Sequence, residues 1–145
     1  MCNQERASVI AIITSLLTNG FILTRYLQLS SAGALTGPDA TMIWARVVLW
    51  MIPAAIVLTI VLNVLFSISM RERLLDSTAD ERDRLFQLRG MHVMAVVFGI
   101  GFVGAMAGLA SGWVPLTGFI VIWIGAALGD LSGNVVRIAS YRLGS

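Results

Sequence analysis

Long apolar runs free of charge alternate along the chain with short charged segments. The first run covers residues 7–24 and ends at Arg25, and the second covers residues 47–70 between Arg46 and Arg71. The hydrocarbon core of a bilayer is about 30 Å thick and takes roughly 20 helical residues to cross. Each run therefore predicts one membrane-spanning helix.

A third apolar stretch is too long for a single span. Between Arg89 and Asp130 the sequence has no Asp, Glu, Lys or Arg. One helix of this length would measure about 60 Å, roughly twice the bilayer core. The segment 111–115, Ser-Gly-Trp-Val-Pro, supplies a break, because Gly112 can end a helix in the left-handed conformation and Pro115 suits the first turn of the next. The stretch therefore predicts two helices in a tight antiparallel hairpin.

The pattern predicts an all-α fold, a single integral membrane domain over residues 1–145 with four transmembrane helices in an antiparallel up-and-down bundle. Composition agrees, since 57% of the residues are hydrophobic and only 12% are charged, against about 25% charged in soluble proteins. The spans are expected at about 7–25, 45–70, 92–111 and 114–138, with a cytoplasmic loop or short amphipathic helix at 71–91.

The first run has a second interpretation, as a cleaved signal peptide, because Ala-Gly-Ala at 32–34 resembles a cleavage site. The apolar region is too long for that role, and Glu5 and Arg6 give the preceding residues little net positive charge. We therefore expect a retained helix.

The distribution of arginine predicts the orientation in the membrane. All ten basic residues are Arg, and only Arg25 and Arg46 fall on the side opposite to the termini and the central loop. Arginine is enriched in cytoplasmic loops. We therefore expect a multi-pass protein of the plasma membrane with both termini in the cytoplasm, and a topology signal rather than a nucleic-acid-binding surface.

The central loop predicts a short helix. Thr78 and Glu81 have the spacing of a capping box, and Leu85, Leu88 and His92 recur on one face. This helix either continues into the third span or turns at Gly90 to lie along the interface.

The charges of this loop offer a candidate interaction surface for a soluble cytoplasmic partner. Lipid headgroups fit less well, because acids alternate with the arginines. A third interpretation is a solvated cap that fixes only topology and solubility. The residues concerned are Asp80, Glu81, Arg82, Asp83 and Arg84.

Glycines recur at every fourth position in both helices of the predicted hairpin. Such rows form smooth grooves that let helix backbones approach closely in lipid. We expect the third and fourth helices to pack on these grooves; alternatively, one groove packs between protomers of a homo-oligomer. The rows are Gly104, Gly108 and Gly112 in the third helix, and Gly125, Gly129 and Gly133 in the fourth.

Asp130 is the only acid within or near a predicted span, and it lies towards the cytoplasmic end of the fourth helix. Asn134 and Arg137 follow it on the same face, and Arg89 and His92 at the start of the third helix are expected at similar depth. The sequence predicts a polar cluster of these five residues, with Asp130 paired to Arg89 or His92. Intramembrane acids serve in proton coupling or join helices structurally.

The sequence has no constellation typical of an enzyme. It contains one His and one Cys, Cys2, too few for a metal site, and the G-x-G-x-x-G match at 99–104 lies inside an apolar span rather than between a strand and a helix. We expect no catalytic activity, metal or cofactor. Thr14, Thr18 and Asn19 in the first helix and Asn63 in the second are expected to form hydrogen bonds between helices, and Pro53 to kink the second helix.

Two clusters resemble a family of small, uncharacterised prokaryotic four-helix membrane proteins. One is Asp-Glu-Arg-Asp at 80–83, followed after five residues by Arg-Gly at 89–90. The other is Val-Arg-Ile at 136–138 with the ending Tyr-Arg-x-Gly at 141–144, in which Leu143 replaces an expected Arg. The resemblance implies four spans and brings no activity with it.

Two functions are compatible with the sequence. The first is a non-enzymatic membrane module or regulator that acts through the central loop. The alternative is a small oligomeric transporter or exporter with Asp130 as the coupling acid. Four-helix multidrug exporters resemble one another in having a glutamate in the first helix, and residues 7–24 contain no acid. A lipid-modifying enzyme, a third class, lacks a catalytic cluster.

Overall fold

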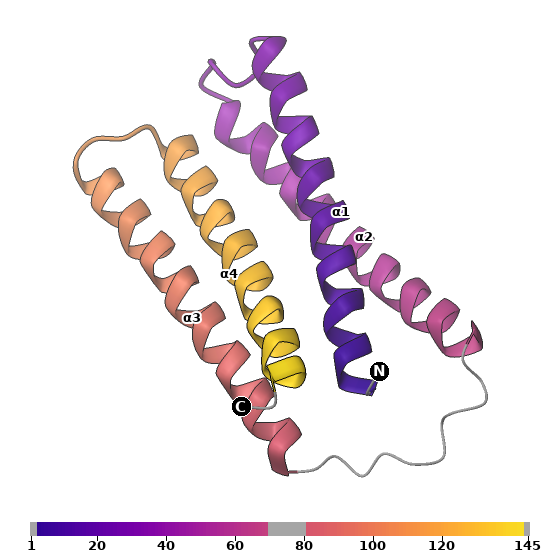
Figure 1. The fold of residues 1–145 in the computed structure, drawn as a ribbon. Helices are drawn as coiled ribbons and strands as arrows, with labels where there is room; N and C mark the ends of the chain where they lie inside the picture. Colours follow the sequence, from indigo (N-terminus) through magenta and orange to yellow (C-terminus); the bar gives the residue numbers. More distant parts are fainter. Residues whose placement is uncertain (1–2, 70–80, 144–145) are drawn as a thin grey trace.

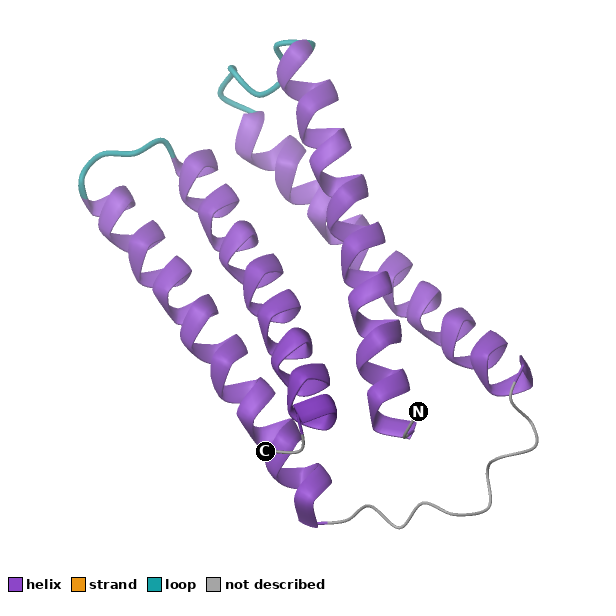
Figure 2. Cartoon of the chain, in the orientation of Figure 1, coloured by secondary structure: helices purple, strands orange, loops and turns teal. Residues whose placement is uncertain are grey.

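The computed structural model describes residues 3–69 and 81–143, and this part of the chain contains helices and no strand. Figure 2 shows the described loops, at 32–39 and 111–114, as short connections between long helices. The predicted all-α fold with four antiparallel helices is confirmed. The helices are α1 (Asn3–Ser31), α2 (Ala40–Ser69), α3 (Glu81–Ala110) and α4 (Pro115–Leu143).

Each helix is long and apolar enough to cross a bilayer, so the chain is a multi-pass membrane protein. The candidate spans are Ala7–Ser31, Ala40–Leu65, Arg84–Ala110 and Pro115–Leu143. Helix α3 begins at Glu81 and runs without interruption through Gly90. The helix of the charged segment thus continues into the third span and does not turn at Gly90 to lie along the interface.

Glycines in the left-handed conformation end α1 and α3. At Gly112 the angle φ is 94°, and the Trp113 amide donates to the carbonyl of Gly108 across 3.0 Å. Gly33, with φ of 71°, ends α1 in the same way. This geometry is the Schellman motif, which gives the last carbonyls of a helix their hydrogen-bond donors. The predicted break before Pro115 is confirmed.

The four helices pack in the spatial order α3, α4, α1, α2 (Figure 1). Helices α3 and α4 lie side by side along their whole length, and α4 also packs on α1. Helix α2 is held mainly by α1; the two lie close near their connecting loop and diverge towards the other end (Figure 1). Helix α2 continues through Pro53.

Most large apolar side chains face outward. The buried cluster lies where α1, α2 and α4 meet, and consists of Ile22, Ala40, Trp44 and Leu116. By contrast, Leu49, Ile100 and Val103 are each about two-thirds exposed. In water such a surface would drive aggregation, whereas in a bilayer it contacts lipid chains.

Candidate functional site

The α3–α4 interface is formed largely by glycine. A Cβ atom on Gly101 of α3 would lie 2.8 Å from the Cα of Gly125 of α4. Likewise a Cβ on Gly129 would lie 2.9 Å from the carbonyl oxygen of Met94, and one on Gly133 would lie 2.7 Å from that of Gly90. Real Cβ atoms do not approach this closely, so the glycine row of α4 lies directly against the backbone of α3.

The row predicted for α3 is wrong at Gly104, where an added Cβ would meet nothing within 4 Å. The residues of α3 that lie against the glycines of α4 are Met94, Phe98 and Gly101 instead, and Gly108 receives the ring of Trp113 from the connecting loop. The face of α3 that packs on α4 therefore passes through Gly90, Met94 and Gly101, and Gly104 lies off this face.

The polar stripe on α4 is joined by hydrogen bonds within the helix. The side-chain amide of Asn134 donates to the carbonyl oxygen of Asp130 (2.9 Å) and to its Oδ1 (3.1 Å). Asn134 is only 3% exposed. Arg137, one turn further, lies against Gly90 of α3, since a Cβ there would clash with the Arg137 side chain. The stripe thus packs against the beginning of α3.

Two polar atoms of this stripe are buried without a hydrogen-bond partner among the described residues, Oδ1 of Asn134 and Nε of Arg137. One is an acceptor and the other a donor. The stripe therefore contains one buried acceptor and one buried donor that the described residues do not satisfy.

Arg89 and His92 do not complete the predicted cluster. Gly90 faces α4, so His92, two residues later, is turned about 200° around the helix, and it is exposed. The guanidinium of Arg89 lies 5.9 Å from the centre of the Phe86 ring. Asp130 has Asn134 as its side-chain partner. The predicted pairing of Asp130 with Arg89 or His92 is therefore wrong.

An aromatic contact at the same end of the bundle was not predicted from the sequence. Phe86 of α3 meets Tyr141 of α4 edge to face, with ring centres 5.1 Å apart and planes at 86°. Phe86 is 4% exposed, whereas Leu85 and Leu88 are 56% and 40% exposed. The packed face of this segment is therefore that of Phe86 and Gly90, and the predicted face of Leu85, Leu88 and His92 is wrong. The sequence feature that could have indicated this contact is Phe86, a single aromatic residue within a charged segment.

The candidate interaction surface is only partly described. Thr78 of the capping box and Asp80 lie outside the described residues, whereas residues 81–83 form the first turn of α3. Arg84 follows them on the same helix and is exposed. The charges from Glu81 to Arg84 thus belong to the helix that packs on α4.

A second polar contact joins α1 to α4. The indole nitrogen of Trp123 donates to Oδ1 of Asn19 across 3.0 Å, and the Asn19 amide donates to the carbonyl of Ser15. Trp44 of α2 packs edge to face on both Trp123 and Tyr26. The predicted interhelical role of Asn19 is confirmed, and its tryptophan partner was not foreseen.

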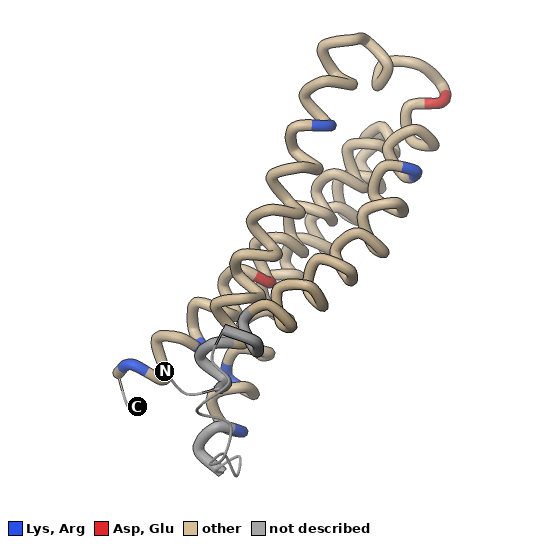
Figure 3. The backbone as a smooth tube through the Cα atoms, turned by 90° about the vertical axis from the view of Figure 1, so that its right-hand side faces the viewer, with Lys and Arg blue, Asp and Glu red and all other residues tan. Residues whose placement is uncertain are grey.

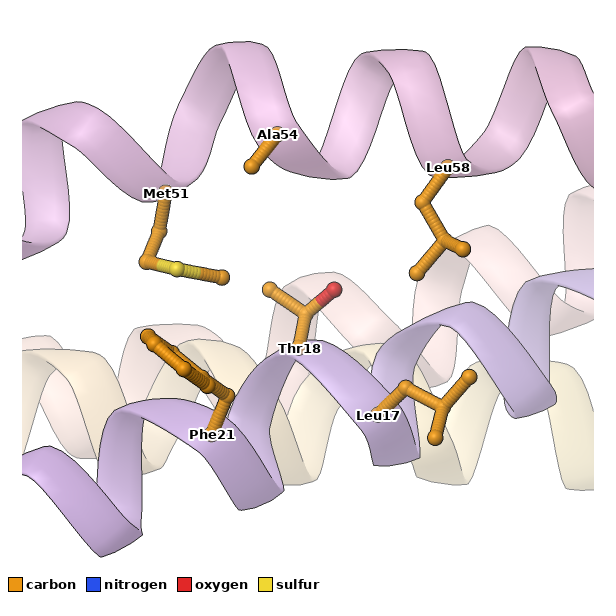
Figure 4. A pocket seen from close by; sticks show the side chains of 6 residues that line it. All are labelled: Leu17, Thr18, Phe21, Met51, Ala54 and Leu58. Carbon is orange, nitrogen blue, oxygen red and sulfur yellow. The ribbon is translucent and has the colours of Figure 1, made fainter.

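Thr14 and Thr18 do not form the predicted interhelical bonds. The hydroxyl of each is buried and has no hydrogen-bond partner among the described residues. Thr18 lies in an apolar groove of about 270 Å³ between α1 and α2. Figure 4 shows it pointing from α1 towards α2, beneath Ala54 and between Met51 and Leu58. The remaining lining residues are Leu17 and Phe21 of α1.

Among the described residues, no three His, Cys, Asp or Glu side chains come together in a way that could hold a metal ion. No family model, curated protein or solved structure shows significant similarity to the chain.

Proposed function

We propose that the chain is a non-enzymatic membrane module that presents the charged beginning of α3 to a soluble cytoplasmic partner. The observation that supports this proposal most is the continuity of α3 from Glu81 to Ala110. A break at Gly90 would separate the charges from the bundle. Instead the charged turn and the membrane span belong to one helix.

Contacts with α4 hold this end of α3 in place. Gly90 lies against Gly133 and the side chain of Arg137, and Phe86 packs on Tyr141 one turn earlier. Backbone contact of this kind leaves little room for one helix to shift relative to the other. A partner bound at the charged turn would therefore be held at a fixed position on the bundle.

The proposal places this end in the cytoplasm and the protein in the plasma membrane. Figure 3 shows basic residues gathered at the end of the bundle where α3 begins and α4 ends. The arginines of these two helices are Arg82, Arg84, Arg89, Arg137 and Arg142, whereas Arg25 and Arg46 belong to the segments near the α1–α2 loop. Arginine enriched on one side supports a cytoplasmic location of that side.

The test is affinity purification of the full chain from native membranes. Five substitutions remove the charges of residues 80–84: Asp80→Asn, Glu81→Gln, Arg82→Gln, Asp83→Asn and Arg84→Gln. The control neutralises Asp39 and Arg46 near the opposite end. We expect a specific soluble protein to co-purify with the wild type and the control, and to be lost with the fivefold variant. Co-purification that does not depend on these charges would refute the proposal.

The transporter remains the second candidate, supported by the surroundings of Asp130. Its described side-chain partner is the amide of Asn134 rather than a cation. A transporter this small would need several copies to enclose a pathway. Because α3 covers the glycines of α4, a second copy would use the open side of α3 at Gly104. Loss of proton-coupled efflux from vesicles on Asp130→Asn, with no effect of the charged turn, would favour this function over the module.

A further inference from the structure

The side chain of Arg137 crosses α3 at a notch formed by Gly90. A Cβ atom on Gly90 would lie 2.5 Å from Cγ of Arg137 and 2.6 Å from its Nε. A larger residue at position 90 would therefore push the arginine away. Because Gly90 has no side chain, the stem of Arg137 lies against the backbone of α3, which determines where the guanidinium ends.

The guanidinium of Arg137 has no partner for its charge among the described residues. Arg137 is half-buried, and of its three nitrogens only Nε is enclosed. The two terminal nitrogens remain accessible, and no oxygen of the described residues bonds to them. Arg25, by contrast, donates to the side-chain oxygen of Gln28. The nearest acid of α4, Asp130, lies seven residues deeper, about 10 Å along the helix. A half-buried cation without an anion costs free energy, so an anion from outside the chain would be stabilised here.

The depth of Arg137 restricts what the anion can be. Arg137 follows Pro115, at the hairpin tip, by 22 residues, which corresponds to about 33 Å along α4. Gly90 precedes Ala110, at the same tip, by 20 residues, or about 30 Å along α3. The hydrocarbon core is about 30 Å thick. With the hairpin tip at one boundary of the core, Arg137 and Gly90 therefore lie at the other, where the anionic group of a bilayer is the phosphate of its lipids.

The charges around the notch favour a headgroup with a net negative charge. Outside the deeper Asp130, α3 and α4 contain five arginines and only two acids, Glu81 and Asp83, and all of these residues lie at this end of the hairpin. An excess of arginine at the membrane surface attracts anionic lipids. The same excess repels the cationic group that a zwitterionic headgroup such as phosphocholine places beside its phosphate.

We propose that Arg137 binds the phosphate of an anionic phospholipid at the notch of Gly90, with its two terminal nitrogens donating to two phosphate oxygens. The planar fork of a guanidinium matches this geometry. The acyl chains extend from the boundary into the hydrocarbon, along the outer surface of the hairpin. The site needs neither proposed function, because it uses neither a soluble partner nor the carboxyl group of Asp130.

The test is native mass spectrometry of the full chain in micelles, titrated with phosphatidylglycerol or with phosphatidylcholine of the same acyl chains. We expect Arg137→Gln to raise the Kd for phosphatidylglycerol about tenfold, the scale of a charge-assisted hydrogen bond. Arg46→Gln removes the same charge near the opposite end of the bundle and should match the wild type. Phosphatidylcholine should bind the wild type more weakly than phosphatidylglycerol, and Arg137→Gln should reduce the difference.

A second variant tests the notch without changing any charge. Gly90→Ala displaces the Arg137 side chain, so it should weaken phosphatidylglycerol binding in the wild type and have no further effect in Arg137→Gln. Additive effects of the two substitutions would refute the role of the notch. Equal affinities of Arg137→Gln and Arg46→Gln for phosphatidylglycerol would overturn the proposal. Displacement of the lipid by an equal concentration of glycerol phosphate would also overturn it, since the site would then take a soluble phosphate.

Discussion

Gly101 of α3 and Gly125 of α4 touch through their backbones, and neither position has room for a side chain. A Cβ on Gly101 would lie 2.8 Å from the Cα of Gly125, and a Cβ on Gly125 would lie 3.0 Å from the Cα of Gly101. Between membrane helices such contact replaces the hydrophobic driving force that lipid does not supply. The same two helices also meet at Gly90 and Gly133, nearer the charged beginning of α3.

The first prediction concerns this crossing. Gly101→Ala should lower the free energy of unfolding by about 1–3 kcal/mol, because the added methyl group forces the two backbones apart. Gly104→Ala is the matched control on the same helix, where the space is open; it should leave stability unchanged or raise it by up to about 1 kcal/mol through helix propensity. Unfolding in mixed micelles measures both. A loss at position 104 as large as that at 101 would contradict the observed face of α3.

The second prediction concerns the Asn19–Trp123 hydrogen bond. Asn19→Leu should destabilise the bundle by about 1 kcal/mol, the scale of interhelical hydrogen bonds in membranes. Asn63→Leu is the control, since the Asn63 amide donates to Thr59 within its own helix and the residue is exposed. The same unfolding assay compares them. If Asn63→Leu costs as much as Asn19→Leu, the interhelical bond does not contribute.

The third prediction concerns the contact between Phe86 and Tyr141. A double-mutant cycle with Phe86→Ala and Tyr141→Ala should give a coupling energy of about 1 kcal/mol, as for edge-to-face pairs. A second cycle with Phe86→Ala and Phe119→Ala serves as control, because Phe119 lies near the opposite end of α4 and is 53% exposed. The coupling energy between Phe86 and Phe119 should be zero within experimental error. Additivity of the Phe86 and Tyr141 effects would refute the contact.

The fourth prediction concerns topology. Cys2 is the single cysteine of the chain, so Cys2→Ser gives a background for one introduced cysteine at a time. We expect Ser111→Cys, at the hairpin tip, to react with a membrane-impermeant maleimide in intact cells. Arg142→Cys, at the other end of α4, should react only after the cells are opened. Labelling of Arg142→Cys in intact cells would reverse the proposed orientation.

The sequence was sufficient for the helices and the hairpin because both depend on local properties. The length of each apolar run predicts a span, and Gly112 with Pro115 predicts the turn from their backbone preferences alone. Asn19 was recognisable because an amide in an apolar helix needs a partner.

Rotation of each helix about its axis could not be read from the sequence. From residue spacing alone, α3 could pack through the row containing Gly104 or through the face of Leu85 and His92. In the structure other faces of α3 contact α4. Gly90 turned towards α4 carries His92 to the far side, which removes the predicted pair with Asp130. The unpaired hydroxyl of Thr18 depends on a side-chain rotamer, a property that residue spacing does not determine.

The central structural claim is that the charged beginning of α3 is held on the end of α4. Its most direct test is a distance measurement between spin labels on Leu85→Cys and Leu143→Cys, two exposed positions, in the Cys2→Ser background in nanodiscs. We predict one narrow distance distribution, which Gly133→Leu broadens and Gly104→Leu leaves unchanged. A broad distribution without any glycine substitution would show that this end of α3 moves independently of α4 and would contradict the account.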